Sequence, residues 1–361
     1  MRNKGIIAGL ILMMIILSFS GCLDFFTTNG SITYQSHPTK ISYTISYGYR
    51  ITCTGSGQYE IDYNCDEPEV LKGQITLHSL IGDDYETKTI ATYNRVKSWD
   101  INDDVNKEYN LGITASVVSE SYTISDLRGE DALAMPELKN QYPDIVEQYT
   151  QAQSNETTVF IDPENSQIKS KAFSILLECV TNNPFLLARE LFRWLKQETT
   201  YQIHLGSNDV QPAETTFQCK TGDCDDLSYL YISLCRSIGI PARFIRGFLV
   251  EETSVVPHAW AEVFVGGDLG NNGWIPVECA GVSSDPETQI NQNFGLESAD
   301  HLRLFTDDGS NESLIASLSG LTYVTYGTRS CEPIYYSDIT DYAVLESNEL
   351  VIDENNNRFY Q

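Results

Sequence analysis

A cysteine directly before an amphipathic helix, followed by strand-like segments, is the feature that most constrains the fold of this chain. Cys224 follows Asp223, and the run after it repeats apolar residues at helical spacing up to about Ile238. Gly239 and Pro241 then favour the end of the helix. We therefore predict Cys224 at a helix N-terminus. There the helix dipole and free N–H groups favour a thiolate, which is the nucleophilic form of cysteine.

Two later segments alternate as strands do and carry the groups that a cysteine nucleophile needs. In HAWAEVFV, His258, Trp260 and Glu262 fall on one side of the predicted strand, and GWIPVE ends on Glu278. An imidazole can take the thiol proton and later protonate a leaving amine, while a carboxylate fixes the tautomer of the ring. We therefore predict a catalytic set of Cys224, His258 and Glu278. Trp260 and Glu262 are expected to support the sheet.

The segments GDCDDLSYLYISLCRSIGIPARFIRGF, HAWAEVFV and GWIPVECA, in this order, resemble the three core blocks of the transglutaminase-like superfamily. The resemblance implies a papain-like arrangement, in which the nucleophile lies on a helix packed against an antiparallel sheet. It implies Cys224 as the nucleophile, His258 as the base and Glu278 as the acid that orients the base. The strict match covers residues 218–282, within a domain expected at 130–345.

The third block departs from the family pattern, because Glu278 and a cysteine stand where Asp and Pro are usual. Glutamate is one methylene longer and can still reach an imidazole, and Asp285 is the nearest downstream substitute. For an oxyanion, the backbone N–H of Cys224 is one natural donor. Gln218 is a second candidate, because its spacing resembles that of the oxyanion glutamine of papain. Tyr201 is another candidate.

The first residues have the three-part layout of a secretory signal. Arg2 and Lys4 give a basic start, an apolar stretch follows over residues 5–19, and two small residues precede Cys22. We expect a signal peptide over residues 1–21 and a lipid on Cys22. The mature protein would then be anchored on the outer face of the cytoplasmic membrane. The alternative is an uncleaved N-terminal helix that anchors the same exported protein.

Composition and spacing divide the rest of the chain into further segments. Residues 23–40 are mostly polar and are expected to form an irregular tether. Short alternating runs between turn residues over 41–127 predict an all-β sandwich. Helical spacing begins near residue 130, so the expected fold is α+β, with the transglutaminase-like domain at 130–345. Residues 346–361 are expected to be a frayed tail.

An exported chain with nine cysteines invites disulfides. Cys53 and Cys65 flank a short polar turn and strand-like residues, which predicts a bridge across a hairpin. Three N-x-S/T sequons are candidate glycosylation sites, at Asn29, Asn155 and Asn311. His78 is expected to be a surface or packing residue, and His204 and His301 are expected at the surface.

The charge and the spacing of the remaining residues argue against some function classes. The formal net charge is −27, whereas binding of a phosphate backbone needs an excess of Lys and Arg, so no nucleic acid is expected. Neither a zinc-type cysteine spacing nor a calcium-binding loop is visible, and the sequence predicts no metal and no cofactor.

The leading hypothesis is a thiol enzyme that attacks amide or isopeptide bonds through a Cys224 thioester. Water as acceptor would make it a peptidase or amidase, and a lysine-type amine would make it an acyltransferase. The outside location favours hydrolysis of a protein or a cell-envelope polymer. The alternatives are a non-catalytic binding or structural module of the cell surface, and an assembly factor whose partners bind the β-sandwich.

Overall fold

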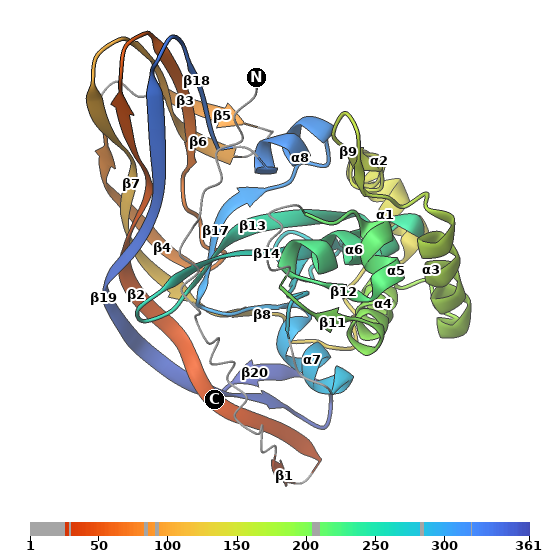
Figure 1. Ribbon diagram of the computed structural model, residues 1–361. Coiled ribbons are helices and arrows are strands. Elements are labelled where there is room, and N and C mark those ends of the chain that lie inside the picture. Colours follow the sequence, from red (N-terminus) through yellow and green to blue (C-terminus); the bar gives the residue numbers. More distant parts are fainter. Residues whose placement is uncertain are drawn as a thin grey trace.

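The computed structural model describes residues 26–28, 30–82, 86–90, 94–203, 210–281, 285–318 and 320–361. The predicted signal peptide, the lipidation candidate Cys22, the sequon at Asn29 and His204 lie outside the described residues. Within the described ranges, no helix is both long enough and apolar enough to cross a membrane. A β-sandwich forms one side of the molecule, and helices packed around a third sheet form the other (Figure 1).

The larger sheet of the sandwich is built on two very long strands. β2 (Ser31–Thr54) and β19 (Ser330–Ile352) are antiparallel neighbours along most of their lengths. The other strands of this sheet are β20 (Arg358–Tyr360) beside β19, β7 (Lys107–Glu120) and β4 (Gly73–Ile81) beyond β2, and β1 (Phe26–Thr28) against the start of β2. Ile41, Tyr43 and Ile45 are buried at alternate positions, so one face of β2 meets the core.

A second sheet completes the sandwich. Its order is β18 (Leu321–Thr325), β3 (Tyr59–Asp66), β6 (Asn94–Asp103) and β5 (Glu86–Ile90). Ile45 and Ile51 of the larger sheet pack with Tyr59, Ile61 and Trp99 of the smaller one in a single buried cluster. The sandwich predicted from the alternating runs is confirmed, although β18, β19 and β20 come from the end of the chain.

Two polar segments form strands where loops were expected. Residues 31–40, the expected tether, form the first part of β2, and Tyr34 is buried there with its hydroxyl bonded to Asn291. Residues 346–361, the expected tail, form the end of β19, a turn and β20. In β20 the buried guanidinium of Arg358 donates hydrogen bonds to three backbone carbonyls. Polar composition was misleading because long-range pairing, rather than apolar content, orders these strands.

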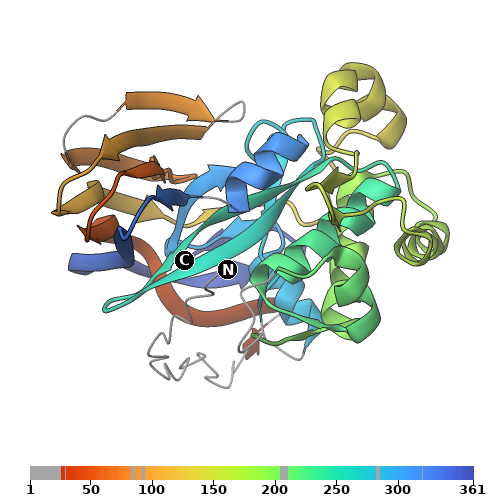
Figure 2. The same cartoon turned by 45° about the horizontal axis from the view of Figure 1, so that its top comes forward.

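The other half of the molecule places helices against a third antiparallel sheet (Figures 1 and 2). The sheet order is β15 (Trp274–Val277), β14 (Val255–Phe264), β13 (Ala242–Val250) and β17 (His301–Thr306). Helix α6 (Cys224–Ser237) packs against β13 and β14, and against α3 (Ser166–Cys179), α4 (Pro184–Glu198) and α5 (Ala213–Cys219). All residues of α6 from Asp226 to Ser237 are buried, so α6 is the centre of this core.

Shorter elements connect these layers. The remaining helices are α1 (Met135–Gln141), α2 (Pro143–Gln148), α7 (Pro286–Asn293) and α8 (Asn311–Leu318). Three pairs of short strands are β8 (Tyr122–Thr123) with β16 (Leu296–Glu297), β9 (Gln153–Ser154) with β10 (Val159–Ile161), and β11 (Thr200–Tyr201) with β12 (Thr221–Gly222). Asn183 caps α4 by accepting hydrogen bonds from the N–H groups of Phe185 and Leu186.

The sandwich braces the third sheet. Phe248 of β13 meets Tyr47 of β2 edge-on, with ring centroids 5.6 Å apart. Arg246 of β13 forms an ion pair with Asp66 of β3 at 2.7 Å. These contacts fix β13, and β14 pairs along the full length of β13.

The predicted bridge between Cys53 and Cys65 is wrong. The turn between them does not close a hairpin, because β2 belongs to the larger sheet and β3 to the smaller one. Cys65 lies near the far end of β3, roughly 20 Å along the strand from the turn, which is too far for a disulfide. Cys53 lies instead directly opposite Cys331 of β19.

Candidate active site

Cys224 is the first residue of α6, as the sequence predicts. The helix begins here because Asp223 has an extended backbone and its N–H donates to the Asp226 carboxylate in the first turn, at 3.2 Å. The backbone N–H groups of a first helical turn have no acceptor within the helix. Just upstream, parallel pairing of β11 with β12 places Tyr201 beside Gly222.

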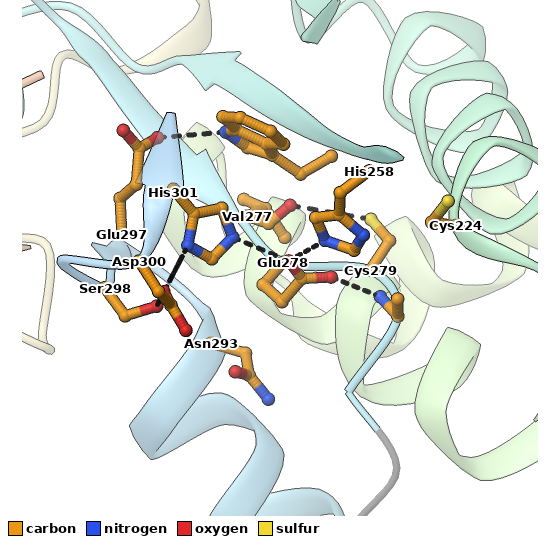
Figure 3. A network of polar contacts seen from close by, with 12 residues as sticks. Cys224, His258, Val277, Glu278, Cys279, Asn293, Glu297, Ser298, Asp300 and His301 are labelled. Atoms are coloured by element: carbon orange, nitrogen blue, oxygen red, sulfur yellow. Dashed lines mark hydrogen bonds and ion pairs between the residues drawn. The ribbon is translucent and has the colours of Figure 1, made fainter. Parts of the chain in front are cut away.

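His258 lies on β14 and faces the start of α6. It is 6% exposed, and its ring stacks on that of Trp260, with centroids 5.8 Å apart. The backbone N–H of Ala259, the next residue, faces Cys224 and acts to lower the pKa of its thiol. Figure 3 shows Cys224 on one side of the His258 ring and Glu278 on the other.

Glu278 directly follows β15, and its side chain reaches the imidazole. Its Oε2 lies 2.6 Å from Nε2 of His258, and its Oε1 accepts a hydrogen bond from the N–H of Ala280 at 2.6 Å. Glutamate thus makes the contact to the histidine ring despite its extra methylene. Asp285, the alternative considered from the sequence, instead caps α7 by accepting from the N–H of Thr288.

A second histidine contacts Glu278 from the side opposite His258 (Figure 3). Nε2 of His301 lies 3.0 Å from the same Glu278 Oε2, and its Nδ1 lies 3.0 Å from Asp300 and 2.9 Å from the hydroxyl of Ser298. His301 is 6% exposed, so the expectation of a surface residue is wrong. The one sequence signal was its position at the start of an apolar strand, directly after an aspartate.

The charges of this cluster complement one another. Burial would raise the pKa of Glu278, but the two imidazoles outweigh it and hold that pKa well below its usual range. Burial would lower the pKa of His301, but its hydrogen bonds to Asp300 and Glu278 raise it to about 10. At neutral pH, therefore, Glu278 is a carboxylate and His301 an imidazolium.

The surroundings of Cys224 favour the thiol, in contrast to the thiolate expected at a helix N-terminus. Burial raises the pKa of Cys224 well above its ordinary value, and the negative charges of Asp225 and Asp223 raise it further. The backbone N–H of Ala259 acts in the opposite direction. Burial and the neighbouring Asp223 also raise the pKa of Asp225, to about 8, so Asp225 exerts its full effect on Cys224 only above neutral pH. These acids offset the helix dipole, so a base is needed to remove the thiol proton.

Residues 178–279 match the family model of the transglutaminase-like superfamily. This segment belongs to that superfamily. The match contains Cys224, His258 and Glu278, and it confirms the resemblance carried by the three sequence blocks.

Solved structures match the chain at low sequence identity. A proposed cysteine protease from Cytophaga hutchinsonii matches with a TM-score of 0.52 and 16% identity, over 91% of this chain and 99% of that one. The periplasmic domain of TgpA from Pseudomonas aeruginosa matches with a TM-score of 0.34 and 14% identity, over 75% of this chain and 74% of that one. No curated protein matches the sequence.

The oxyanion candidates of the transglutaminase-like domain lie in different places. Gln218 is exposed on α5 and donates to Glu214 at 3.1 Å, so the structure does not bring it to Cys224. The chain turns after α5 through Lys220, whose φ of 61° is left-handed, and spacing alone could not reveal that turn. Tyr201 lies close enough for Cys224 to affect it. Burial raises the pKa of Tyr201, and a thiolate at Cys224 would raise it further, so the Tyr201 hydroxyl remains a hydrogen-bond donor.

Behind the site, a buried ion network ties the strands of the transglutaminase-like domain together. Glu262 of β14 accepts from Arg303 of β17 at 2.6 Å and from Arg243 of β13 at 2.7 Å. Arg303 also bonds to Glu297, which accepts from the indole N–H of Trp260 at 2.9 Å. These contacts agree with the interpretation of Trp260 and Glu262 as residues that support the sheet.

Two groups of side chains in the described ranges bring potential metal ligands within 4.8 Å of one another. They are His258 with Glu278 and His301, and Asp223 with Cys224 and Asp225. In the first group the nitrogen–oxygen distances of 2.6 and 3.0 Å are those of hydrogen bonds. The polar contacts described above account for this group without an ion.

The two described sequons lie next to each other. Asn155 accepts hydrogen bonds from the N–H groups of Thr157 and Thr158 in a turn, and Asn311, at the start of α8, accepts from Ser154. Glycosylation at these asparagines stays a prediction.

Replacing Glu262 with Gln should lower the free energy of unfolding near pH 7 by about 3 kcal/mol, because the buried Arg303 and the partly buried Arg243 lose their carboxylate partner. Burial would raise the pKa of Glu262, but Arg303 and Arg243 lower it to about 2. Its contribution is therefore present above the ordinary value of 4.5 and is lost as the pH falls through about 2. Urea unfolding across this range should show the two proteins converging toward low pH. The exposed Glu251→Gln is the control, and a pH-independent difference would contradict this assignment.

Proposed function

We propose that this chain is a thiol enzyme in which Cys224 attacks an amide or isopeptide carbonyl. The observation that supports this best is the convergence of three groups from separate elements. Cys224 comes from the start of α6, His258 from β14 and Glu278 from the end of β15. A nucleophile, a base and an acid that orients the base are the minimum that such chemistry requires.

Acylation begins with transfer of the thiol proton from Cys224 to His258. The sulfur attacks the carbonyl carbon, and Glu278, at 2.6 Å, stabilises the imidazolium that forms. His258 then donates the proton to the leaving amine, and a thioester on Cys224 remains. Because burial and nearby acids raise the pKa of Cys224, removal of the proton by His258 is part of the reaction and not a property of the resting site.

The tetrahedral intermediate needs donors for its oxyanion. The backbone N–H of Cys224 is at the first position of α6, where a helix provides no internal acceptor. Tyr201 supplies a second donor in this proposal, because its hydroxyl stays protonated close to Cys224.

The thioester is resolved by an acceptor that His258 deprotonates. Water yields a carboxylic acid and makes the enzyme a peptidase or amidase, whereas a lysine-type amine yields a new amide. We favour hydrolysis of a protein or cell-envelope polymer because the chain begins with features of an exported protein. The Cytophaga hutchinsonii protein that shares the fold is itself a proposed cysteine protease, which agrees with hydrolysis.

Replacing Cys224 with Ala should abolish turnover without unfolding the protein, because the thiol packs at a helix start and carries no structural bond. Casein incubated with the full-length chain tests both acceptors. New amino termini would report hydrolysis, and incorporation of dansylcadaverine would report transfer. Like Cys224→Ala, the His258→Ala variant should lose activity, by about three orders of magnitude or more. Activity that persists in Cys224→Ala would exclude this mechanism. An inert wild-type protein whose Cys224 also resists alkylation would favour the non-catalytic surface module.

We also propose that the mature protein lies outside the cytoplasm, anchored by a lipid on Cys22. The supporting observation is the basic, apolar and small-residue order of residues 1–21. Intact mass of the protein from its native membrane should lack residues 1–21 and carry an added lipid. Cys22→Ser should remove both changes. An unprocessed chain would instead indicate the uncleaved helix, and a chain in the soluble cytoplasmic fraction would exclude both anchors.

A further inference from the structure

We propose that His301 is a positioning residue for the reaction. It holds the Glu278 carboxylate as a permanent counter-charge while His258 gains and loses its proton. This inference rests on the proposed function, in which His258 is the base and Glu278 orients it.

The geometry makes Glu278 a shared acceptor. Its Oε2 lies 2.6 Å from Nε2 of His258 and 3.0 Å from Nε2 of His301. On its far side His301 is held by Asp300 and Ser298 through Nδ1, so its ring orientation is set at both nitrogens. The ring of Trp260 packs edge-on against it, with centroids 4.8 Å apart.

An imidazolium in this position changes what Glu278 does to His258. A lone buried carboxylate would stabilise a charged His258 strongly and would make that ring a poor proton donor to the leaving amine. With His301 charged, the carboxylate still orients His258, but its negative charge is largely compensated. The raised pKa of about 10 for His301 agrees with this assignment.

Other titratable groups face this cluster and are part of the same electrostatic balance. Near Cys224 these groups are Asp223, Asp225 and Tyr201. Near Glu278 they are Lys196 and Cys279. On the side of Asp300 they are Tyr43, Tyr342 and Tyr360 from the larger sheet. Apart from His301 itself, only Lys196 among these groups carries a positive charge. Its ammonium group donates to the backbone carbonyls of Cys279 and Gly281.

The test is the pH dependence of iodoacetamide alkylation at Cys224 in the full-length chain, followed by peptide mass spectrometry. His301→Gln keeps an N–H donor for Glu278 but removes the charge. The His258 and His301 ring centroids are 5.6 Å apart. Loss of a positive charge at that range leaves Glu278 uncompensated and stabilises the protonated form of His258. The pair of Cys224 thiolate and His258 imidazolium is then favoured, so Cys224 alkylation should shift to lower pH by about one to two pH units. His78→Gln, the same replacement on an exposed strand, is the matched control and should leave the midpoint unchanged.

A second measurement needs no variant. In the wild-type protein with labelled histidine, the NMR signal of the His301 ring should stay that of an imidazolium up to about pH 9, given its pKa of about 10. A neutral His301 ring at pH 7.5 overturns the proposal, as does an alkylation profile that His301→Gln leaves unchanged. His258→Ala separates the two hypotheses. If His258→Ala alters the pH profile of Cys224 alkylation and His301→Gln does not, the proposed function stands and this inference fails. If neither variant alters that profile, both the proposed function and this inference fail.

The larger sheet carries a second, independent inference: we infer that Cys53 and Cys331 form a disulfide in the exported protein. The two residues are direct partners in the antiparallel pairing of β2 with β19. They are 1% and 6% exposed and lie in the same buried cluster. Burial raises the pKa of Cys53 to about 12, and the neighbouring Cys331 thiol adds to this. Directly opposite residues in such a ladder have Cα atoms about 4.5–5.5 Å apart, which is within the range of disulfides.

The bond would form by exchange with a disulfide-bearing thiol oxidoreductase of the exported compartment. The thiolate of one cysteine attacks the disulfide of the oxidant and forms a mixed disulfide with it. The thiolate of the second cysteine then attacks the sulfur of the first, which forms the protein disulfide and releases the oxidant. Two protein thiols become one disulfide and the oxidant leaves as a dithiol. Because the folded sheet buries both residues and disfavours the thiolate of Cys53, the exchange belongs to folding, before the core closes.

Peptide mapping without reductant, on the full-length protein from its native membrane, should give one linked peptide pair that contains Cys53 and Cys331. Its mass should be two hydrogens below that of the separate peptides. The double variant Cys53→Ser/Cys331→Ser should lose the pair and melt roughly 5 °C lower. Cys65→Ala, in the same core, is the control and should retain the pair. Quantitative alkylation of both cysteines in the unreduced protein, or a link from Cys331 to Cys65, would overturn this inference.

Discussion

The burial of α6 is the constraint on which the arrangement of the site depends. Because the helix is enclosed from Asp226 to Ser237 by three helices and the third sheet, its start has a fixed position against β14. The influence of the Ala259 N–H on the pKa of Cys224 reflects this proximity. The sandwich secures the sheet from behind, through Arg246 and Asp66. Packing that has no chemical role therefore determines how closely a thiol can approach an imidazole.

Within that frame, electrostatics divides the site into two halves. Near Cys224 the neighbours are acidic and the thiol is partly buried, which favours the neutral thiol. Around Glu278 the neighbours are imidazoles, which favour the carboxylate. His258 lies between the halves and is the group through which a proton can pass from one to the other (Figure 3). In a chain with a net charge of −27, a single buried imidazolium at His301 has few competitors for this role.

The helix and strands that carry the site could be predicted because each has its own local pattern. Cys224, His258 and Glu278 stand at recognisable points of those patterns, and the structure brings His258 and Glu278 into contact. His301 could not be recognised, because pairing of β17 with β13 brings it to the site and no spacing near the other residues signals it. The same limit explains the strands at both ends of the described chain. Residues 31–40 and 346–361 look like loops until the distant partner strand is known.

The pairing of β2 with β19 has a consequence for biosynthesis. β2, the middle strand of the larger sheet, is made long before its neighbour β19, because most of the described residues lie between them in the sequence. Until β19 is synthesised, one edge of β2 stays open, with unpaired backbone groups that other chains could bind. The larger sheet cannot be completed before then, and such distant pairing is slow to form. A chain that stays incompletely folded for this long suits translocation in an extended state and makes a chaperone valuable on the way.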